Sequence, residues 1–260
     1  MGLTTAHQKH VVVVDESVTP NALHFSEIFN VAVPFIDRPV AEGRGGAVAV
    51  RYAGEDITYA ELSENVARAG NALLDLGLKP GSRLMMAAQD DPYYFYVFWG
   101  AIKAGIIPIS ASTFVKANDY RHLIDDSQCE AFVYSAALED QVAGLEKMTS
   151  QPRFILPIDG PGSLAERIAA ASPRLEPAET AATDDCFWLF SSGSTGLPKG
   201  VVHRHRDMVV TSEREVGPSR PTCTPGPTPR AWSASMATGA WRIFGTATVT
   251  ASISGSTIRS

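Results

Sequence analysis

Between residues 83 and 171 the sequence alternates short apolar runs with longer segments whose apolar residues recur every three or four positions. The short runs predict buried strands, and the three-to-four spacing predicts helices. Strands that alternate with helices of this length favour an α/β fold, in which helices cover a largely parallel sheet through right-handed crossovers. The predicted strands are residues 83–88, 106–111, 131–134 and 154–158, and the predicted helices are residues 91–104, 117–127, 138–148 and 163–171.

The part of the chain before this alternation carries a different pattern. Residues 1–20 show no regular repeat and are predicted to be a loosely structured lead-in with one short strand. Over residues 21–46 the apolar residues take helical spacing, which predicts a helical region. Residues 47–52 predict a strand, and a turn at residues 54–56 separates that strand from the next helix.

That next helix has signals at both ends. Thr58 and Glu61 stand three residues apart in the arrangement of a capping box, and Gly77 provides the stop. Its apolar face consists of Leu62, Val66, Ala69, Ala72, Leu73 and Leu76. The helix predicted at residues 91–104 is strongly aromatic over residues 93–99, which favours packing against the sheet over a platform for a ligand.

The most distinctive chemistry lies in residues 191–200, Ser-Ser-Gly-Ser-Thr-Gly-Leu-Pro-Lys-Gly, which follow an apolar strand-like run at residues 186–190. Glycines let backbone N–H groups turn toward one point and form an anion-binding nest. The hydroxyl groups add donors and the lysine adds a positive charge, so this segment is predicted to bind a polyphosphate. The candidate site residues are Ser191, Ser192, Gly193, Ser194, Thr195, Gly196, Lys199 and Gly200.

The spacing of this loop excludes one common nucleotide motif. A Walker A loop reads G-x-x-x-x-G-K-S/T, whereas Gly193, Gly196 and Lys199 form G-x-x-G-x-x-K. A flexible Ser/Gly linker is the structural alternative. The apolar run before the loop and the Val201-Val202 pair after it disfavour that alternative, because a linker needs no flanking strands.

Residues 191–200 fit the pattern Ser/Thr-Ser/Gly-Gly-Ser/Thr-Thr/Ser-Gly-x-Pro-Lys-Gly. They therefore resemble the phosphate loop of the adenylate-forming (AMP-binding) enzymes, which include acyl-CoA synthetases, luciferases and the adenylation domains of peptide synthetases. Residues 29–38 resemble the opening of the benzoate–CoA ligase branch, and residues 57–62 and 105–109 fit patterns closer to the whole family. The resemblance covers about residues 21–210.

The resemblance implies a fold and an activity. The fold would be the N-terminal part of the large domain of these enzymes, an α/β structure of mostly parallel sheets flanked by helices, here with a disordered C-terminal tail. The activity would join a small aromatic carboxylic acid of the benzoate type to coenzyme A through an acyl-adenylate, using ATP and Mg²⁺. The catalytic residues would then be Thr195, as a hydroxyl contact to the β- and γ-phosphates, and Lys199, as the cation beside the leaving pyrophosphate.

Two other functions stay open. One is a different adenylate-forming enzyme, such as a fatty or hydroxybenzoic acid–CoA ligase or a carrier-protein-loading adenylation domain. The other is a non-catalytic nucleotide-binding fragment. Enzymes of this family usually carry an acid pocket and a mobile lysine-bearing domain in a second half that is not recognisable here, so we expect this chain to be inactive alone.

The composition changes abruptly after residue 215. Residues 216–260 contain no Leu, Lys, Asp, Glu, Asn, Gln, His or Tyr. Such a stretch buries too little apolar area to offset its chain entropy, which predicts disorder. We interpret it as an out-of-frame tail, with a genuine disordered tail as the alternative. The predicted organisation is a lead-in at 1–20, a partial AMP-binding domain at 21–215 and this low-complexity tail at 216–260.

The net charge and the positions of cysteines and histidines limit the kinds of partner and metal site that we expect. The net charge of −6 predicts no nucleic-acid surface, and the absence of a long apolar run or a recognisable signal peptide predicts a cytoplasmic protein without membrane contact. The oligomeric state stays open. Isolated Cys129, Cys186 and Cys223 predict buried free thiols. His203 and His205 are expected to share one side of a strand, but they lack a third ligand, so no metal site is predicted.

Overall fold

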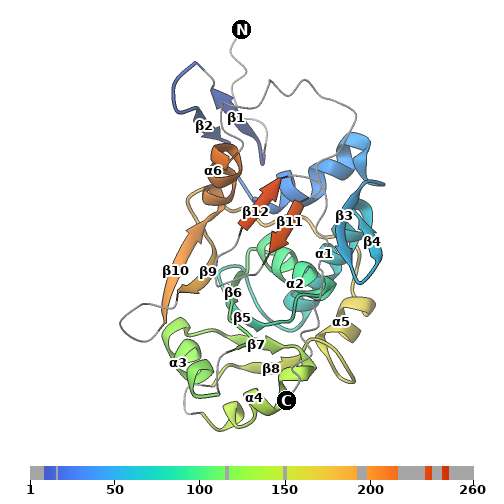
Figure 1. Ribbon diagram of the computed structural model, residues 1–260, viewed down its shortest axis with the longest axis vertical. Helices are drawn as coiled ribbons and strands as arrows, with labels where there is room; N and C mark the ends of the chain where they lie inside the picture. Colours follow the sequence, from blue (N-terminus) through green and yellow to red (C-terminus); the bar gives the residue numbers. More distant parts are fainter. Residues whose placement is uncertain are drawn as a thin grey trace, which may run out of the picture.

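The computed structural model describes residues 9–15, 17–114, 117–148, 151–191, 198–215, 232–235 and 242–245. Its centre is a six-stranded sheet with the order β10-β9-β6-β5-β7-β8 (Figure 1). Neighbouring strands run parallel from β9 to β8, and β10 pairs antiparallel with β9 at one edge. The strands are β5 (Arg83–Ala87), β6 (Ile107–Ser110), β7 (Ala131–Tyr134), β8 (Phe154–Pro157), β9 (Asp185–Ser191) and β10 (Lys199–Arg204).

Helices cover both faces of this sheet, which confirms the predicted α/β fold. Helix α2 (Pro92–Lys103) joins β5 to β6, and α3 (Ala117–Ser127) joins β6 to β7. Successive residues of β5 point to two different cores, because Leu84 and Met86 pack with α2 whereas Met85 packs with α3. The remaining helices of the sheet are α1 (Tyr59–Asp75) and α5 (Leu164–Ala170) on the side of α2, and α4 (Glu139–Val142) on the side of α3.

Helix α1 begins with the predicted capping box. The Thr58 hydroxyl accepts a hydrogen bond from the Glu61 N–H at 3.3 Å, and the Glu61 carboxylate accepts one from the Thr58 N–H at 2.8 Å. Further along, α1 crosses α2 where Gly70 meets Gly100. A Cβ atom on Gly70 would lie 2.8 Å from the Gly100 carbonyl oxygen, so this close helix crossing requires glycine.

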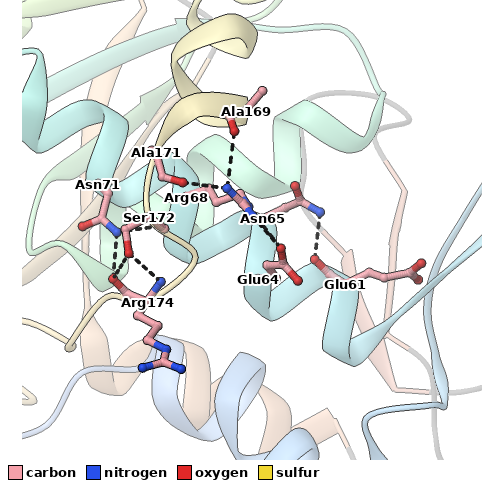
Figure 2. Close-up of polar contacts among 9 residues, drawn as sticks. All are labelled: Glu61, Glu64, Asn65, Arg68, Asn71, Ala169, Ala171, Ser172 and Arg174. Carbon is pink, nitrogen blue, oxygen red and sulfur yellow. Dashed lines mark hydrogen bonds and ion pairs between the residues drawn. The ribbon is translucent and has the colours of Figure 1, made fainter.

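The polar side of α1 holds the segment that follows α5 (Figure 2). We call residues 171–184 the strap, because they connect α5 to β9 without helix or strand. Arg68 donates to the Ala171 carbonyl at 2.6 Å, and Asn71 donates to two strap carbonyls at 2.8 Å. Glu64 orients Arg68 through a 2.8 Å ion pair. These donors satisfy carbonyls at and beyond the end of α5 that have no partner within the helix; the acceptors are Ala169, Ala171, Ser172 and Arg174.

The helical prediction for residues 21–46 is wrong in its first part. Strand β2 (Ala22–Phe25) occupies that part and pairs with β1 (Val12–Asp15), and helical turns begin only near η2 (Val33–Asp37). The hairpin packs apolar residues against the core, so pairing with the neighbouring strand β1 overrides the local helical spacing. The other elements of this region are η3 (Val40–Arg44) and the hairpin of β3 (Val48–Tyr52) and β4 (Glu55–Thr58).

The single helix predicted at residues 138–148 is also wrong. The chain instead makes short helical turns, of which α4 is the central one. Ala143 has an extended ψ of 130°, and Gly144 has a φ of 88°, so the helix ends after Val142. The flanking turns are η4 (Ala136–Leu138) and η5 (Leu145–Lys147).

Beyond the sheet, the structure describes α6 (His205–Glu215) and a separate antiparallel hairpin of β11 (Trp232–Ser235) and β12 (Arg242–Gly245). The two strands differ from the prediction that residues 216–260 carry no ordered structure. No proline follows Pro229, so backbone N–H groups in this part are available for ladder pairing. Other residues of that segment lie outside the described part of the chain. Among the residues that the structure describes, no helix has the length and apolar character needed to cross a membrane.

Candidate functional site

The predicted phosphate loop joins the two strands of a hairpin. Strand β9 ends at Ser191 and β10 begins at Lys199, and these two residues lie opposite each other in the ladder. The backbone thus holds the lysine directly across from the first residue of the loop. The predicted site residues Ser192, Gly193, Ser194, Thr195 and Gly196 lie outside the described residues, so their contacts stay predictions.

The hairpin opens at the edge of the sheet where the parallel strands end. Because β5, β6 and β9 run parallel, Ala87, Ser110 and Ser191 at their carboxyl ends share this edge. Helices α2 and α3 leave β5 and β6 toward opposite faces of the sheet. Sheets of this kind bind ligands at such a point, outside the carboxyl ends of the strands.

A buried pair of hydroxyl groups lies at the same edge. The Tyr94 hydroxyl and the Ser110 hydroxyl are 2.8 Å apart, and burial raises the pKa of Tyr94 well above its ordinary value. Tyr94 is therefore a neutral hydrogen-bonding group at all physiological pH values. Sequence reasoning placed Tyr94 only in an aromatic core helix, since nothing local indicates that the sheet order brings it to Ser110.

Two carboxylates near this edge accept hydrogen bonds from backbone N–H groups. Asp91 caps α2 by accepting the Tyr94 N–H at 3.3 Å, and Asp159 accepts the Ala136 N–H at 2.8 Å. Burial raises the pKa values of Asp90 and Asp91. Within the described ranges, no group of three His, Cys, Asp or Glu side chains could hold a metal ion. Asp91 and Asp159 are thus acceptors for backbone N–H groups at this edge.

Gly200 has a packing role that the sequence did not reveal. A Cβ atom at this position would lie 3.1 Å from the ring of Trp188 on the neighbouring strand. The Trp188 ring is itself covered by the Arg83 guanidinium, 5.5 Å from the ring centroid. The indole therefore leaves little room for a side chain at position 200, in addition to any backbone freedom that the loop requires.

The two histidines after the loop do not share a side, so that prediction is wrong. Strand β10 ends at Arg204 with an irregular register after His203, and His205 is the first residue of α6. His203 stacks on Phe187 with ring centroids 4.6 Å apart and planes 7° apart. The His205 Nδ1 atom instead accepts the backbone N–H of Val31 at 3.2 Å.

An aromatic ladder connects the hairpin to α2. The Phe187 ring that stacks on His203 meets Phe98 edge-on at 5.6 Å, and Phe98 stacks on Tyr94 at 5.9 Å. This packing confirms that the aromatic helix belongs to the core. Cys129 and Cys186 are buried free thiols with raised pKa values, as predicted, and Cys223 lies outside the described residues.

Comparison with protein families decides the affiliation of the chain. The sequence profile of the family described as AMP-binding enzyme matches residues 38–254, which include the whole β9–β10 hairpin. The chain belongs to the AMP-binding enzyme family. The match of this AMP-binding enzyme chain also extends into the segment from residue 216 onward, which the composition predicts to be out of frame.

Individual relatives of this AMP-binding enzyme chain are benzoate–CoA ligases. The benzoate–CoA ligase of Thauera aromatica is 38% identical over 204 residues, which are 77% of this chain and 39% of that protein. The 4-hydroxybenzoate–CoA/benzoate–CoA ligase of Rhodopseudomonas palustris is 37% identical over 200 residues, covering 73% and 36%. The crystal structure of a benzoate CoA ligase from Burkholderia xenovorans LB400 superimposes with a TM-score of 0.65 at 30% identity, covering 74% of this chain and 37% of the other. The chain thus spans well under half the length of these relatives.

Proposed function

We propose that this chain carries the phosphate-loop part of an ATP-dependent aromatic carboxylic acid–CoA ligase of the benzoate type. The observation that carries the proposal is the likeness to proteins named as benzoate–CoA ligases, at 38% and 37% identity over about three quarters of the chain. The fold supports it, because the loop opens at the carboxyl edge of a parallel sheet, the usual ligand position in such sheets.

The reaction has two steps in which bonds and charges balance. A carboxylate oxygen of the acid attacks the α-phosphorus of ATP and forms an acyl-adenylate as pyrophosphate leaves. The thiol sulfur of coenzyme A then attacks the acyl carbon, AMP leaves, and the thiol proton passes to solvent. The first step concentrates negative charge on the departing pyrophosphate, so backbone N–H groups and cations aimed at its oxygens lower the barrier.

The proposal assigns roles to the loop residues. Backbone and hydroxyl donors from Ser191 to Gly196 bind the β- and γ-phosphates, with Thr195 as the principal hydroxyl contact. Lys199 neutralises the leaving pyrophosphate, and its position opposite Ser191 keeps its backbone within one ladder pair of the loop. When bound with ATP, Mg²⁺ neutralises further phosphate charge. The described residues offer no three-ligand metal group of their own, so we assign no protein ligand to it.

Enzymatic assays distinguish this function from its alternatives. Two proteins are compared: the 260-residue chain, and a chimera of residues 1–215 with the remaining length of the Thauera aromatica relative. We expect the chimera to exchange pyrophosphate into ATP when benzoate is present and to form benzoyl-CoA, and the chain alone to bind ATP without turnover. A preference for hydroxybenzoate or a fatty acid, or transfer to a carrier-protein thiol, would assign the chain to another adenylate-forming enzyme.

The Lys199→Ala chimera tests the site within that assay. Loss of one charged donor from such a site lowers the rate by about 10²–10³-fold. An unchanged exchange rate in a folded Lys199→Ala chimera would show that the catalytic assignment is wrong. ATP binding by a chimera that never turns over any acid would favour the non-catalytic alternative.

We also propose that residues 216–260 are an out-of-frame tail on a partial AMP-binding domain at residues 21–215. The missing residue types support this proposal, whereas the family match to residue 254 and the β11–β12 pairing oppose it. Resequencing the gene from codon 195 past the stop decides between them. A second frame that continues with leucine-rich, acidic sequence supports the proposal, and its absence contradicts it.

A further inference from the structure

Two neighbouring backbone amides are held by imidazole rings that come from distant parts of the chain. The Asn30 N–H donates to the His10 Nδ1 atom at 2.9 Å, and the Val31 N–H donates to the His205 Nδ1 atom at 3.2 Å. Asn30 and Val31 are fully buried, and His205 is 2% exposed. Neither amide therefore has water as a substitute partner, and each bond needs a ring nitrogen that carries no proton.

The clasped amides belong to a buried segment with further hydrogen bonds. The Asn30 side-chain amide donates to the Ile102 carbonyl at the end of α2 at 2.9 Å, and its oxygen accepts the Ala32 N–H at 3.1 Å. On the other side, the backbone N–H of His205 donates to the Asp184 carbonyl at the end of the strap at 3.2 Å. His205 thus joins the base of the β9–β10 hairpin to α2 through residues 30 and 31.

His10 is held in an unusual backbone conformation. Its φ of 60° lies in the left-handed region that non-glycine residues rarely adopt. The His10 N–H donates to the Ile28 carbonyl at 2.8 Å, and the His10 carbonyl accepts the Arg38 guanidinium at 3.4 Å. The surrounding structure therefore maintains the strain at the position that supplies the imidazole, which is where strain commonly has a purpose.

Both rings are in an environment that favours the neutral form. Burial lowers the pKa of His205 to about 4, although Asp184 opposes the shift and His10 adds to it. Burial, then Lys9, lowers the pKa of His10, against the opposing charges of Asp37 and Glu179. A proton taken up at Nδ1 would place an N–H group against an amide N–H group and break that bond.

We propose that His205 and His10 form a pH-sensitive clasp that positions the base of the phosphate-loop hairpin and opens when the imidazoles bind protons. His205 is a positioning residue, since it touches no reacting atom. The clasp itself stands on the contacts around Asn30 and Val31, and its effect on phosphate binding rests on the function proposed above.

Amide hydrogen exchange of the full chain tests the clasp directly. His205→Ala is expected to speed the exchange of the Val31 amide at least about tenfold, because that buried amide loses the ring nitrogen that accepts its hydrogen bond. His205→Asn places an amide oxygen near the position of Nδ1 and is expected to restore protection. His24→Ala, which removes an exposed histidine of β2, is the matched control and leaves exchange unchanged.

The pH dependence separates the clasp from ordinary packing. The wild-type protection factor of the Val31 amide is expected to fall at least about tenfold from pH 7 to pH 4.5, since the opened form binds a proton that the closed form excludes. The His205→Asn protein is expected to keep its protection over the same range. Parallel pH profiles in the two proteins would overturn the proposal, and so would unchanged exchange in His205→Ala.

Imidazole ¹⁵N shifts and ATP binding provide two further tests of the clasp. If His205→Ala does not fold, ¹⁵N shifts of the wild-type imidazoles decide, because a protonated Nδ1 on His205 at pH 7 contradicts the clasp. ATP binding by the wild-type and His205→Asn chains at pH 7 and pH 5 then tests positioning, with a steeper loss of affinity expected in the wild type. Absence of ATP binding at both pH values would refute the proposed function, whereas Val31 exchange would still decide the clasp.

Discussion

The two ends of the strap are held by residues that respond differently to pH. Next to α1, Arg68 and Asn71 donate hydrogen bonds to strap carbonyls (Figure 2). Next to the phosphate-loop hairpin, the backbone N–H of His205 donates to the Asp184 carbonyl, and the His205 ring nitrogen accepts the N–H of Val31. Guanidinium and amide donors do not titrate near neutral pH, whereas an imidazole accepts only while it is neutral. The bonds between α1 and the strap are therefore independent of pH, whereas the residue that holds the other end of the strap is itself positioned by an imidazole bond that depends on pH.

The largest expected effect is on stability against acid. The pKa of His205 is about 4 in the folded chain and 6.5 in its ordinary state, so the unfolded chain binds the extra proton between these values. The free energy of unfolding should fall as pH drops from 6.5 toward 4, by up to about 3 kcal/mol, and stay flat below pH 4 with respect to this group. Urea titrations at several pH values measure the free energy of unfolding of the wild type and of His205→Asn. An equal dependence of this free energy on pH in the two proteins would contradict the prediction.

The second largest expected effect is a loss of stability at the end of the strap that lies near α1. Gly70→Ala places a Cβ atom 2.3 Å from the Leu175 side chain of the strap and 2.8 Å from the Gly100 carbonyl. We expect a loss of about 2 kcal/mol in unfolding free energy, because this overpacking outweighs the better helix propensity of alanine. Gly46→Ala is the control, since its Cβ atom would meet nothing within 4 Å. A Gly70→Ala chain more stable than the wild type would show that the crossing has room.

A smaller change isolates the donors of α1. Arg68→Met removes the bonds to the Ala169 and Ala171 carbonyls and should cost about 1 kcal/mol. The loss should be the same at pH 5 and pH 8, in contrast to the histidine end. Arg174→Met, an equal change of charge on the strap itself, keeps its backbone acceptor and serves as control. A loss that varies with pH would remove the distinction between the two ends.

The smallest effect lies before the strap. The Ser163 hydroxyl is buried and has no hydrogen-bond partner among the described residues, although Ser163 is the N-cap residue of α5. Ser163→Ala should therefore leave stability unchanged or raise it by less than about 1 kcal/mol in thermal unfolding. A loss of about 1 kcal/mol would instead indicate that the hydroxyl caps the helix.

Local sequence signals predicted many of the helices and strands of this molecule. The alternation of strands and helices, the capping box at Thr58 and the strand before the phosphate loop depend on residues close together in the sequence, and the structure confirms them. Strand β2 could not be predicted in this way, because its partner β1 is separated from it by a loop and the choice of strand over helix depends on that pairing.

The candidate site also contains features that the local sequence predicts and features that depend on the completed fold. Lys199 and Gly200 belong to a sequence pattern and were predicted, but the tight packing of Gly200 against the Trp188 ring on the next strand was not. The clasp had no sequence signal, since 195 positions separate His10 from His205 and only the completed fold brings both to one turn of backbone. Contacts of this range depend on packing that no local pattern encodes.

Lys199 has a second consequence that follows from its place on β10. This strand is the outer one of the sheet in the described part of the chain, and Val201 and Val202 on it are 44% and 40% exposed. If two copies joined β10 to β10 about a twofold axis between these valines, Lys199 would face Arg204 of the other copy, and the like charges would repel. A lysine-to-alanine change made to weaken phosphate binding would thus also remove a charge repulsion that opposes edge-to-edge association. Light scattering must therefore accompany that binding measurement.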